Sequence, residues 1–466
     1  MQALAPSRRA PHATAMQSRS SPIASRIDSR AIWAIALPAM VTNVATALIG
    51  VGDMWIVGRL GDAPTQGAVD IGARLFATLF VVMNFLKTGT TGLVAQAGTR
   101  SAGGAGGEAQ AALLLRGLAV GTAIALVLLI AKPILLPWLL DVLGAEGRVL
   151  GAARIYADIR YWSAPAVMAN FALVGFLVGQ RRMRAVLFFE VAYNLLNLAL
   201  GLWLALGLEW GIAGIGWSSF VAEYAKLLAI ALFVMRGDTG RAIRAAARNA
   251  AILSPAKLRP FLSVNRDLFL RTVVLMIALA ALTRLSAERG PVVLAANGIF
   301  HQLFVLMALL LDGFENAAQV LNGERRGADD RAGFTAYMRA ILWRGFALAA
   351  GVSIALALFA GPLIDTFAAT PAVAKTGRSY AIWLAIMPFA GVAAFVFDGV
   401  FVGASWTRAL LVSMIGAAAV YAASLWLTWP LGNDGLWLSF VLFLALRAVF
   451  QLMLVPRLLR QEFGSD

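Results

Sequence analysis

Residues 35–60 read IALPAMVTNVATALIGVGDMWIVGRL, an apolar stretch long enough to cross a membrane as a helix, and they contain one carboxylate, Asp53. An acid inside a bilayer costs about 2.5–3.5 kcal/mol on insertion scales, so it is interpreted first as a proton or ion site. Asn43, Thr46 and Gly50 precede Asp53 at spacings of three and four residues, which gives the helix one polar face. The stretch therefore predicts a membrane helix with a buried acid near its far end.

Pro38 lies in the first half of the same helix. Proline removes one backbone hydrogen bond and permits a bend, which membrane helices tolerate. A polar helix that can bend and that ends in a buried acid suits a transporter coupled to a cation. The alternative is that Asp53 pairs with a helix terminus or a hydroxyl group and has only a structural role.

The composition predicts an all-α polytopic membrane protein. The 466 residues are 60% hydrophobic and only 14% charged, whereas soluble domains carry about 25% charged residues. The absence of cysteine from the sequence excludes disulfides and thiolate chemistry. The formal net charge of +15 could indicate nucleic acid, but the basic residues lie in alternate loops between apolar segments. We therefore expect the lipid bilayer as partner, and no nucleic acid.

Apolar segments of about 20 residues recur along the chain, and each is long enough to span a bilayer. We expect twelve membrane helices, at 31–57, 68–96, 112–138, 155–179, 185–207, 211–235, 265–287, 292–320, 338–364, 376–403, 409–430 and 434–456. Arginines gather in every second loop and acids in the loops between, so the positive-inside rule predicts that both termini are cytoplasmic. The expected location is a bacterial inner membrane, and the expected state is a monomer.

The sequence contains a repeat. GFLVGQRRMRA begins at Gly175, and GVFVGASWTRA begins at Gly399. The offset of 224 residues (399 − 175 = 224) also pairs Tyr156 with Tyr380. Each half then holds six spans, which predicts two six-helix lobes related by a pseudo-twofold axis along the membrane normal, with the substrate path between them.

The expected boundaries follow from this repeat. They are a disordered cytoplasmic tail at 1–28, an N-lobe at 29–236, a cytoplasmic linker at 237–262, a C-lobe at 263–458 and a cytoplasmic tail at 459–466. The linker is rich in arginine and alanine and is expected to lie as an amphipathic helix on anionic lipid.

Polar residues share one face of the fifth span, where Glu190, Asn194 and Asn197 follow helical spacing. At about 1.5 Å per residue, Asn197 and Ser219 of the sixth span lie at a depth similar to that of Asp53. Asparagine and serine suit a carboxyl that is alternately neutral and charged. The alternative is ordinary hydrogen bonding between helices.

The roles open to the other titratable residues in the predicted spans are more limited. Glu190 lies about 9 Å from the cytoplasmic end of its span, so it is either a second proton site or an ion-pair partner at the interface. Glu223 and Lys226, three residues apart, are expected to neutralise each other. The only histidines, His12 and His301, are too few and too far apart for a metal site, so no metal or other cofactor is expected.

Acids and amides share one face of the eighth span within LLLDGFENAAQVLNG, residues 309–323. They are Asp312, Glu315, Asn316 and Gln319. A second DG pair places Asp398 in the tenth span. These acids form a possible second acidic or substrate site, which would bind a cationic substrate or a second proton. Alternatively, they pair with Lys87 or Arg284, which also lie in predicted spans.

The stretch around Asp53, followed by TTGLVAQAGTRSA, WSAPAVMANFALVGFLVGQ and LDGFENAAQVLNG, resembles the MATE (multidrug and toxic compound extrusion) family, most closely its DinF-like branch. The resemblance runs in matching order over nearly the whole chain from about Ala31. It implies twelve helices in two lobes and cation-coupled export of organic, often cationic, compounds. It also implies an N-lobe coupling site of Asp53, Asn197 and Ser219, the last where threonine is usual.

Two positions depart from that branch. A second aspartate is common four residues after the asparagine, where this sequence has Gly201, and glutamate is expected where it has Gln319. Sodium binding prefers several oxygen ligands, including charged ones, whereas a single buried carboxyl can still take and release a proton. We therefore expect coupling to protons rather than to sodium.

The main alternative function is a lipid or glycan-carrier flippase of the same superfamily, with a basic cavity for phosphate groups. The acids Asp53, Asp312 and Asp398 argue against it, and the cations Lys87 and Arg284 argue for it. An enzyme is not expected, because the sequence holds no histidine pair, no cysteine and no HExxH motif.

Overall fold

The computed structural model describes residues 27–59, 63–100 and 106–464, with their side chains except those of 47–55, 57–58, 63–66 and 250. In these ranges the regular elements are all helical, which confirms the predicted all-α class. They are α1 (Ser29–Arg59), α2 (Ala63–Met83), α3 (Phe85–Arg100), α4 (Gly106–Val142), α5 (Gly147–Tyr161), α6 (Ala164–Gly179), α7 (Met183–Gly201), η1 (Leu202–Gly207), α8 (Gly211–Val234), α9 (Gly237–Ala247), η2 (Ala250–Leu253), α10 (Pro255–Glu288), α11 (Pro291–Gly327), α12 (Arg331–Phe367), α13 (Pro371–Ser379), α14 (Ala381–Gly403), α15 (Thr407–Leu427), η3 (Trp429–Leu431) and α16 (Gly432–Phe463).

Each predicted span coincides with a helix or with two consecutive helices. Ten segments of the described chain are long and apolar enough to cross a membrane, and the pair α5–α6 makes an eleventh. α1 adds a helix of 31 residues. The α5–α6 span is bent by 50°, because α6 restarts at a proline, Pro165, which lacks the N–H that would continue the preceding helix.

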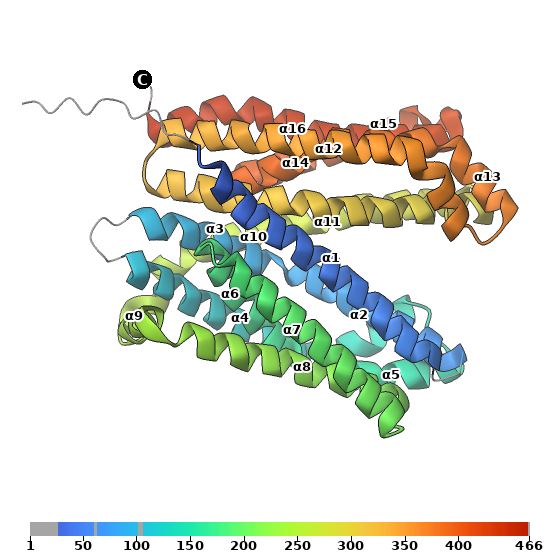
Figure 1. The fold of residues 1–466 in the computed structure, drawn as a ribbon, viewed down its shortest axis with the longest axis horizontal. Helices are drawn as coiled ribbons and strands as arrows, with labels where there is room; N and C mark the ends of the chain where they lie inside the picture. The colour runs from blue at the N-terminus through green and yellow to red at the C-terminus, as the bar shows by residue number, and fades with distance from the viewer. Residues whose placement is uncertain (1–26, 60–62, 101–105, 465–466) are drawn as a thin grey trace, which may run out of the picture.

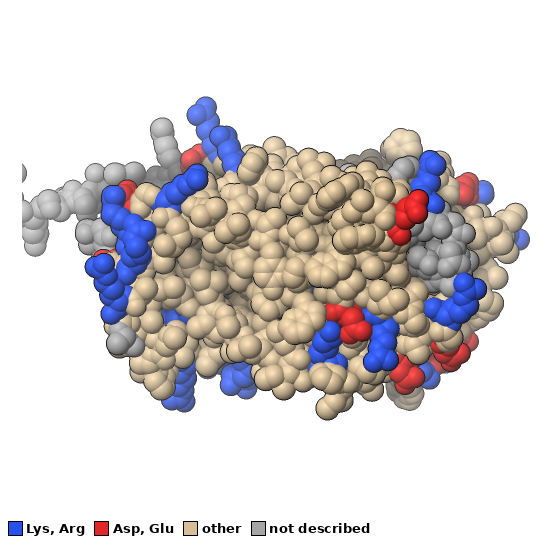
Figure 2. All heavy atoms as spheres, turned by 90° about the horizontal axis from the view of Figure 1, so that it is seen from below, with Lys and Arg blue, Asp and Glu red and all other residues tan. Residues whose placement is uncertain are grey.

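The helices form two bodies, and α1 runs obliquely between them. Figure 1 shows α2–α8, blue to green, on one side and α11–α16, yellow to red, on the other. α1 begins and α16 ends at the same end of the bundle (left in Figure 1), which we call the terminal end, and the opposite end is the distal end. On the face in Figure 2, basic side chains dominate at the terminal end, both signs occur at the distal end, and a mostly uncharged belt separates them.

The hydrophobic core is shared at the terminal end and divided at the distal end. One cluster joins Ile35 and Phe176 of the first body to Phe314 and Phe401 of the second. Towards the distal end, a cluster around Tyr161 belongs to the first body alone, and another around Trp437, Phe300 and Phe440 belongs to the second body alone. The two lobes therefore pack together through their terminal halves.

Glycines let the same helix pair form twice. A Cβ atom added to Gly175 of α6 would lie 2.5 Å from the carbonyl oxygen of Lys87 in α3, and one added to Gly399 of α14 would collide with that of Glu315 in α11. Gly179 meets Thr91 in the same way, and Gly403 meets Gln319. The offset is 224 for the glycines and 228 for their partners (315 − 87 = 228). The internal repeat therefore extends to α3 and α11, and Lys87 is the counterpart of Glu315.

The turns after α6 and α14 repeat as well. Arg181 has φ 60° and Ser405 has φ 57°, and the offset is again 224 (405 − 181 = 224). Residues other than glycine rarely adopt this left-handed conformation. Its recurrence at equivalent positions shows that both turns are built to the same geometry.

The segments outside the spans differ in part from their predicted boundaries. Of the predicted tail at 1–28, residues 1–26 lie outside the described residues, and α16 continues to Phe463 through most of the predicted tail at 459–466. In the predicted linker, α9 and η2 come first, and residues 255–262 already belong to α10. The buried face of α9 (Gly240, Ile243 and Ala246) packs on protein, including α4, so that face is not available to lipid.

We predict that Gly399→Ala destabilises the folded protein by about 1–3 kcal/mol, the usual effect of overpacking, because the new methyl group meets backbone rather than a movable side chain. The measurement is thermal unfolding in detergent. Gly361→Ala in α12 is the control, since a Cβ there meets no atom within 4 Å. Equal melting temperatures for the two variants would contradict the close packing of α14 on α11.

Candidate functional site

The residues predicted for the N-lobe coupling site lie on α1, α7 and α8. Asp53 is part of α1, but its side chain lies outside the described residues. Asn197 and Ser219 are 4% and 2% exposed. The neighbouring Ser218, and not the predicted Ser219, donates a hydrogen bond to Asn197 Oδ1 at 3.3 Å.

An arginine that the sequence analysis did not single out completes this site. Arg160 of α5 donates through Nη1 to Ser219 Oγ at 3.0 Å and to the Tyr156 hydroxyl at 2.6 Å. The guanidinium is a permanent positive charge. It therefore lies beside Ser219, one of the predicted coupling residues.

Gly201 marks the place of the second aspartate that the family pattern led us to expect. A Cβ atom at Gly201 would lie 3.0 Å from Ile56 Cδ1 of α1 and 3.6 Å from Ser218 Oγ. Ile56 follows Asp53 by three residues, so it lies about one turn further along α1. A side chain at position 201 would thus reach between α1 and Ser218, and this sequence leaves that position without a ligand.

α1 is helical without interruption through Pro38. Thr42 donates to the carbonyl oxygen of Pro38 at 2.7 Å, and Thr46 donates to that of Thr42, contacts that often accompany helix bending. Asn43, on the predicted polar face, donates to the carbonyl oxygen of Leu309 in α11 at 3.0 Å. A bend at Pro38 stays a prediction.

Asp398 is the most enclosed acid of the C-lobe. It is 1% exposed and binds Arg271 of α10 and Arg447 of α16 through Oδ2, the latter at 2.5 Å. Gln451 donates to its Oδ1 at 2.6 Å. Charge-assisted hydrogen bonds from three side chains fill both carboxylate oxygens, so Asp398 acts as a cross-link between three helices.

For Asp398, the alternative of pairing with Lys87 or Arg284 is therefore wrong in its partners. Arg284 is on α10, but its side chain is 82% exposed and lies 3.6 Å from Glu288. Neither Arg284 nor Lys87 forms an ion pair with Asp398 among the described residues.

Asp312 and Glu315 lie one turn apart on α11, in the middle of the molecule. Both are half-buried, and no hydrogen bond or ion pair to either carboxylate occurs within the described part of the chain. Lys87 and Arg271 are close enough to act on Asp312 electrostatically. Asn316 bonds the backbone oxygen of Asp312 at 2.7 Å, so its amide nitrogen does not reach the acids. The two carboxylates are therefore available to a ligand.

Lys87, Arg271 and Arg447 face three acids in this region: Asp312, Glu315 and Asp398. When all three acids are ionised, the six charges sum to zero. Arg271 and Arg447 are held by Asp398, whereas Lys87 has no ion pair in the described chain. Adding one proton or one cationic ligand to Asp312 or Glu315 therefore makes the cluster positive.

Glu190 is an ion-pair partner. Its carboxylate lies 2.8 Å from Lys226 Nζ, which supports the second of the two predicted options. The predicted Glu223–Lys226 pair is wrong in its direct contact, because Glu223 Oε2 instead accepts a hydrogen bond from Asn170 at 2.9 Å. Lys226 remains near enough to Glu223 for electrostatic attraction.

The two lobes are fastened at the terminal end by a reciprocal set of four residues, which we call the latch. Gln96 of α3 donates to Ser405 Oγ and to the Gly403 carbonyl oxygen, both at 2.6 Å. Arg181 binds the carboxylate of Glu324 in α11 through two N–H groups. Glu324 is the repeat counterpart of Gln96 (324 − 96 = 228), and Ser405 is that of Arg181. Each lobe therefore holds the other through equivalent positions.

Contacts between the lobes extend only partway along the molecule. The outermost hydrogen bond between the lobes, among described residues, joins Asn43 to Leu309, about halfway along α11 from its terminal end. Gln319 bonds the carbonyl oxygen of Thr88 at 2.5 Å nearer that end. The structure is thus closed at the terminal end, and its lobes are not hydrogen-bonded to each other further out.

Three arginines escaped the sequence analysis: Arg160, Arg271 and Arg447. Each lies inside a predicted membrane span, and a charge in such a span is itself a signal of a buried partner or an internal cavity. Their partners could not be read from spacing, because each contact joins distant parts of the chain.

Comparison with known proteins agrees with this architecture. The MatE family profile matches residues 38–203 and 268–426. The chain is 34% identical to DNA damage-inducible protein F of Escherichia coli (strain K12), over 91% of each chain. It is 23% identical to the probable multidrug resistance protein NorM of Chromobacterium violaceum, over 94% of this chain and 96% of that protein.

A solved structure extends the comparison to the fold. The outward-facing conformation of a multidrug resistance MATE family transporter of the MOP superfamily superposes with a TM-score of 0.82 at 17% identity, over 93% of this chain and 96% of that one. The fold is therefore the twelve-helix, two-lobe fold of these transporters. Because the family profile covers most of the chain and a relative at 34% identity spans 91% of it, this protein belongs to the MatE family, whose members are membrane transporters and not enzymes.

Proposed function

We propose that this protein exports organic, often cationic, compounds in exchange for protons. The observation that carries the proposal is the Asp312–Glu315 pair, two carboxylates without a hydrogen bond or ion pair in the described chain, at mid-molecule between the lobes. Carboxylates that lack fixed partners bind either a proton or an organic cation. Asp398 does not compete for this role, because two arginines occupy it.

The exchange of substrate for proton follows from the charge balance of this cluster. A cation bound at Asp312 and Glu315 adds to a cluster that is neutral when the three acids are ionised. Protonation of either acid then leaves excess positive charge next to the bound cation, with Lys87 held nearby. Substrate and proton therefore disfavour each other, and a ligand shifts the equilibrium between two states by its difference in affinity for them.

The N-lobe site favours protons over sodium. A sodium ion needs several oxygen ligands, and position 201 offers no carboxylate. Protonation of Asp53 requires no such ligand shell, and it changes the hydrogen bonds that Asp53 can offer to Asn197 and to α8.

In the proposed transport cycle, the latch controls whether the acids are exposed to the cytoplasm. The arginine-rich loops lie at the terminal end, so the positive-inside rule assigns that end to the cytoplasm of a bacterial cell, with the protein in the inner membrane. A structure closed at the terminal end then faces outward, ready to release substrate and take up a proton. Opening the latch, with a bend of α1 at Pro38, exposes the acids to the cytoplasm.

A second candidate is a flippase for lipids or glycan carriers. It is favoured by Lys87, a cation without an ion pair in the described chain, and by Arg160, since both can attract phosphate. Two acids lie beside Lys87, however, and they would repel an anionic headgroup. Export of organic cations is the better match to this charge pattern.

The first prediction of this function is proton release on substrate binding. Ethidium added to purified protein in weakly buffered, sodium-free detergent releases protons from the wild type, and Asp53→Asn or Glu315→Gln reduces the release. Glu315→Gln also weakens ethidium binding about tenfold, because one charge-assisted contact is lost. The readout is a pH-sensitive dye together with ethidium fluorescence.

Glu288→Gln is the matched control, since it removes a half-exposed carboxylate that pairs with Arg284 on the surface and leaves release unchanged. Equal proton release from wild type, Asp53→Asn and Glu315→Gln would contradict the proposal. So would ethidium transport in vesicles that follows a sodium gradient and ignores a proton gradient.

The second prediction separates Asp398 from the acids of the site. Asp398→Asn leaves two buried arginines without their counter-ion, and breaking a buried pair in this way costs about 3–5 kcal/mol. We expect a large fall in melting temperature for Asp398→Asn and little change for Glu315→Gln. A stable Asp398→Asn variant that loses ethidium binding would instead place Asp398 in the substrate site.

The third prediction concerns the latch. Glu324→Gln weakens the contact with Arg181 by about 1 kcal/mol, the upper range for a partly exposed ion pair, which changes the ratio of the two states about fivefold. The sequence has no cysteine, so spin labels attach only at cysteines introduced by Arg184→Cys and Arg408→Cys. Both arginines are exposed at the terminal end, on opposite lobes. Pulsed electron spin resonance then reports a larger population at long distance.

The control variant is Asp238→Asn, which breaks an ion pair with Arg241 inside α9 and not between the lobes. It leaves the distance distribution unchanged. An identical distribution in Glu324→Gln and the wild type would show that the latch does not hold the terminal end closed.

A further inference from the structure

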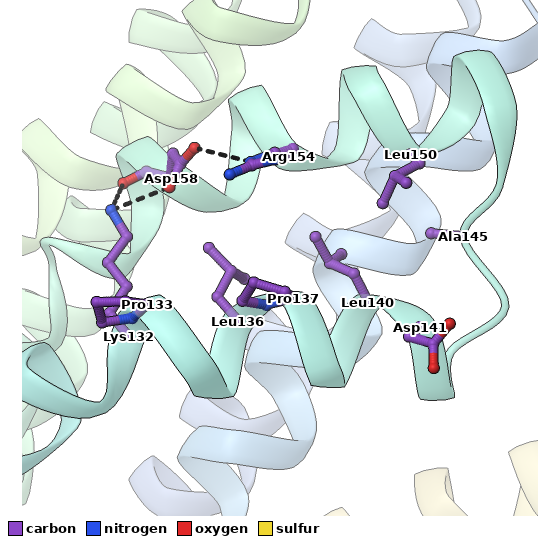
Figure 3. Close-up of a pocket in the computed structure, with 10 residues that line it drawn as sticks. All are labelled: Lys132, Pro133, Leu136, Pro137, Leu140, Asp141, Ala145, Leu150, Arg154 and Asp158. Atoms are coloured by element: carbon purple, nitrogen blue, oxygen red, sulfur yellow. Dashed lines mark hydrogen bonds and ion pairs between the residues drawn. The ribbon is translucent and has the colours of Figure 1, made fainter.

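Lys132 of α4 and Asp158 of α5 form an ion pair in the distal half of the N-lobe, outside the sites described above. Lys132 Nζ lies 3.1 Å from Asp158 Oδ1 and donates to the backbone carbonyl oxygen of Asp158 at 3.1 Å. Arg154, one turn earlier on α5, places Nε 3.9 Å from Asp158 Oδ2. Figure 3 shows both cations directed at this one carboxylate. Together, the three side chains carry one positive charge.

Two cavities meet at this pair, and Lys132 and Asp158 line both. The first, of about 500 Å³, lies between α4 and α5, with Leu136, Leu140 and Leu150 directed into it (Figure 3). The second, of about 410 Å³, is lined mainly by aromatic side chains. These are Trp162, Trp217, Phe220 and Tyr224. The charged group therefore lies between two mainly apolar spaces.

The cluster lies near the distal boundary of the hydrocarbon core. Lys132 follows Arg116, the last charged residue of α4 before the apolar run, by 16 residues (132 − 116 = 16), which is about 24 Å along the helix. The hydrocarbon core of a bilayer is about 30 Å thick. On the same stretch of α4, Ile130 and Ile134 are 78% and 81% exposed. This part of α4 therefore borders lipid near the distal boundary of the bilayer.

The fold itself does not require the pair. At the offset of 224 residues, the C-lobe has Leu356 where the N-lobe has Lys132, and Ile382 where it has Asp158 (356 − 132 = 224). Leu356 lies on α12 and Ile382 on α14, and both are apolar. Because charges near lipid are expensive, their presence in only one lobe indicates a ligand rather than a packing need.

The lobes also differ in an ion pair at the edge of the first cavity. In the C-lobe, Arg378 donates directly to Asp365 at 2.8 Å. The counterparts in the N-lobe are Arg154 and Asp141 (378 − 154 = 224 and 365 − 141 = 224). Arg154 turns to Asp158 instead, and the space between α4 and α5 is left with an arginine at its edge.

We infer that this cluster binds the phosphate of a phospholipid from the distal leaflet. The phosphate accepts hydrogen bonds from Lys132 and Arg154, which together exceed the charge of Asp158 by one. The acyl chains follow the apolar cavity and the exposed isoleucines of α4. Basic pockets between membrane helices are suited to lipid headgroups, and the tryptophans beside this one are typical of the membrane interface.

The test is native mass spectrometry of the full chain, titrated with dioleoylphosphatidylglycerol. We expect one tightly retained lipid on the wild type and binding at least about tenfold weaker in the Lys132→Gln/Arg154→Gln variant, because charge-assisted bonds to phosphate are the strong ones. Leu136→Trp fills the cavity without changing charge and also lowers retention. Arg378→Gln, at the counterpart of Arg154, is the control and retains the lipid.

Thermal unfolding of each variant without added lipid checks that it is folded. Equal lipid retention by the double variant and the wild type would overturn the proposal. Retention of a monogalactosyl diacylglycerol as strongly as the phospholipid would also overturn it, because that lipid has no phosphate. Inorganic phosphate that displaces the lipid at equal concentration would assign the site to free phosphate instead.

Discussion

The close approach of α6 to α3, repeated by α14 on α11, is the constraint on which the rest of the structure depends. At Gly175 and Gly399 the neighbouring backbone leaves no room for a Cβ atom. In a membrane, where lipid and side chains are equally apolar, helices associate through such close packing. The contact fixes the register of α3 and α11, and these two helices carry both the central charges and the latch.

The central charges and the latch residues are separated by the same distance along α3 and along α11. Lys87 precedes Gln96 by nine residues (96 − 87 = 9), and Glu315 precedes Glu324 by nine (324 − 315 = 9). The interval is about 14 Å along each helix. If α3 and α11 move as rigid bodies, a movement that carries Lys87 also carries Gln96, and one that carries Glu315 also carries Glu324. This gives a physical route from charge at the centre to opening at the end, and it requires no separate signal along the chain.

The number of helices, their order and the repeat are predictable from the sequence, because apolar length and repeated letters are local properties. The shared face of Asp312 and Glu315 is predictable for the same reason. The partners of Asp398 are not, because α10, α14 and α16 meet only after folding. Arg271 and Arg284 illustrate this: they lie 13 residues apart on α10 (284 − 271 = 13), about 220° around the helix. One reaches Asp398 and the other faces outward.

The family pattern was informative about the N-lobe residues but not about their partners. Asn197 and Ser219 are both buried, yet the partner of Ser219 is Arg160, which comes from α5 in the bent span. A bend of 50° at Ser163 changes which face of α5 looks inward. Helical spacing counted through residues 155–179 as one straight span could not place Arg160 against Ser219.

The chemistry of the central site depends on the positions at which the two lobes differ. Two lobes with identical side chains would present the same charge to a substrate on both sides of the axis, and a proton would bind either lobe equally. Here the N-lobe has Lys87 at the position where the C-lobe has Glu315, so the central cluster combines a fixed cation from one lobe with titratable acids from the other. In the proposed mechanism, protonation of Asp312 or Glu315 changes the charge balance of the central cluster, whereas the charge of Lys87 stays fixed. The repeat builds two lobes of the same fold. The few positions at which their side chains differ distinguish one side of the substrate path from the other.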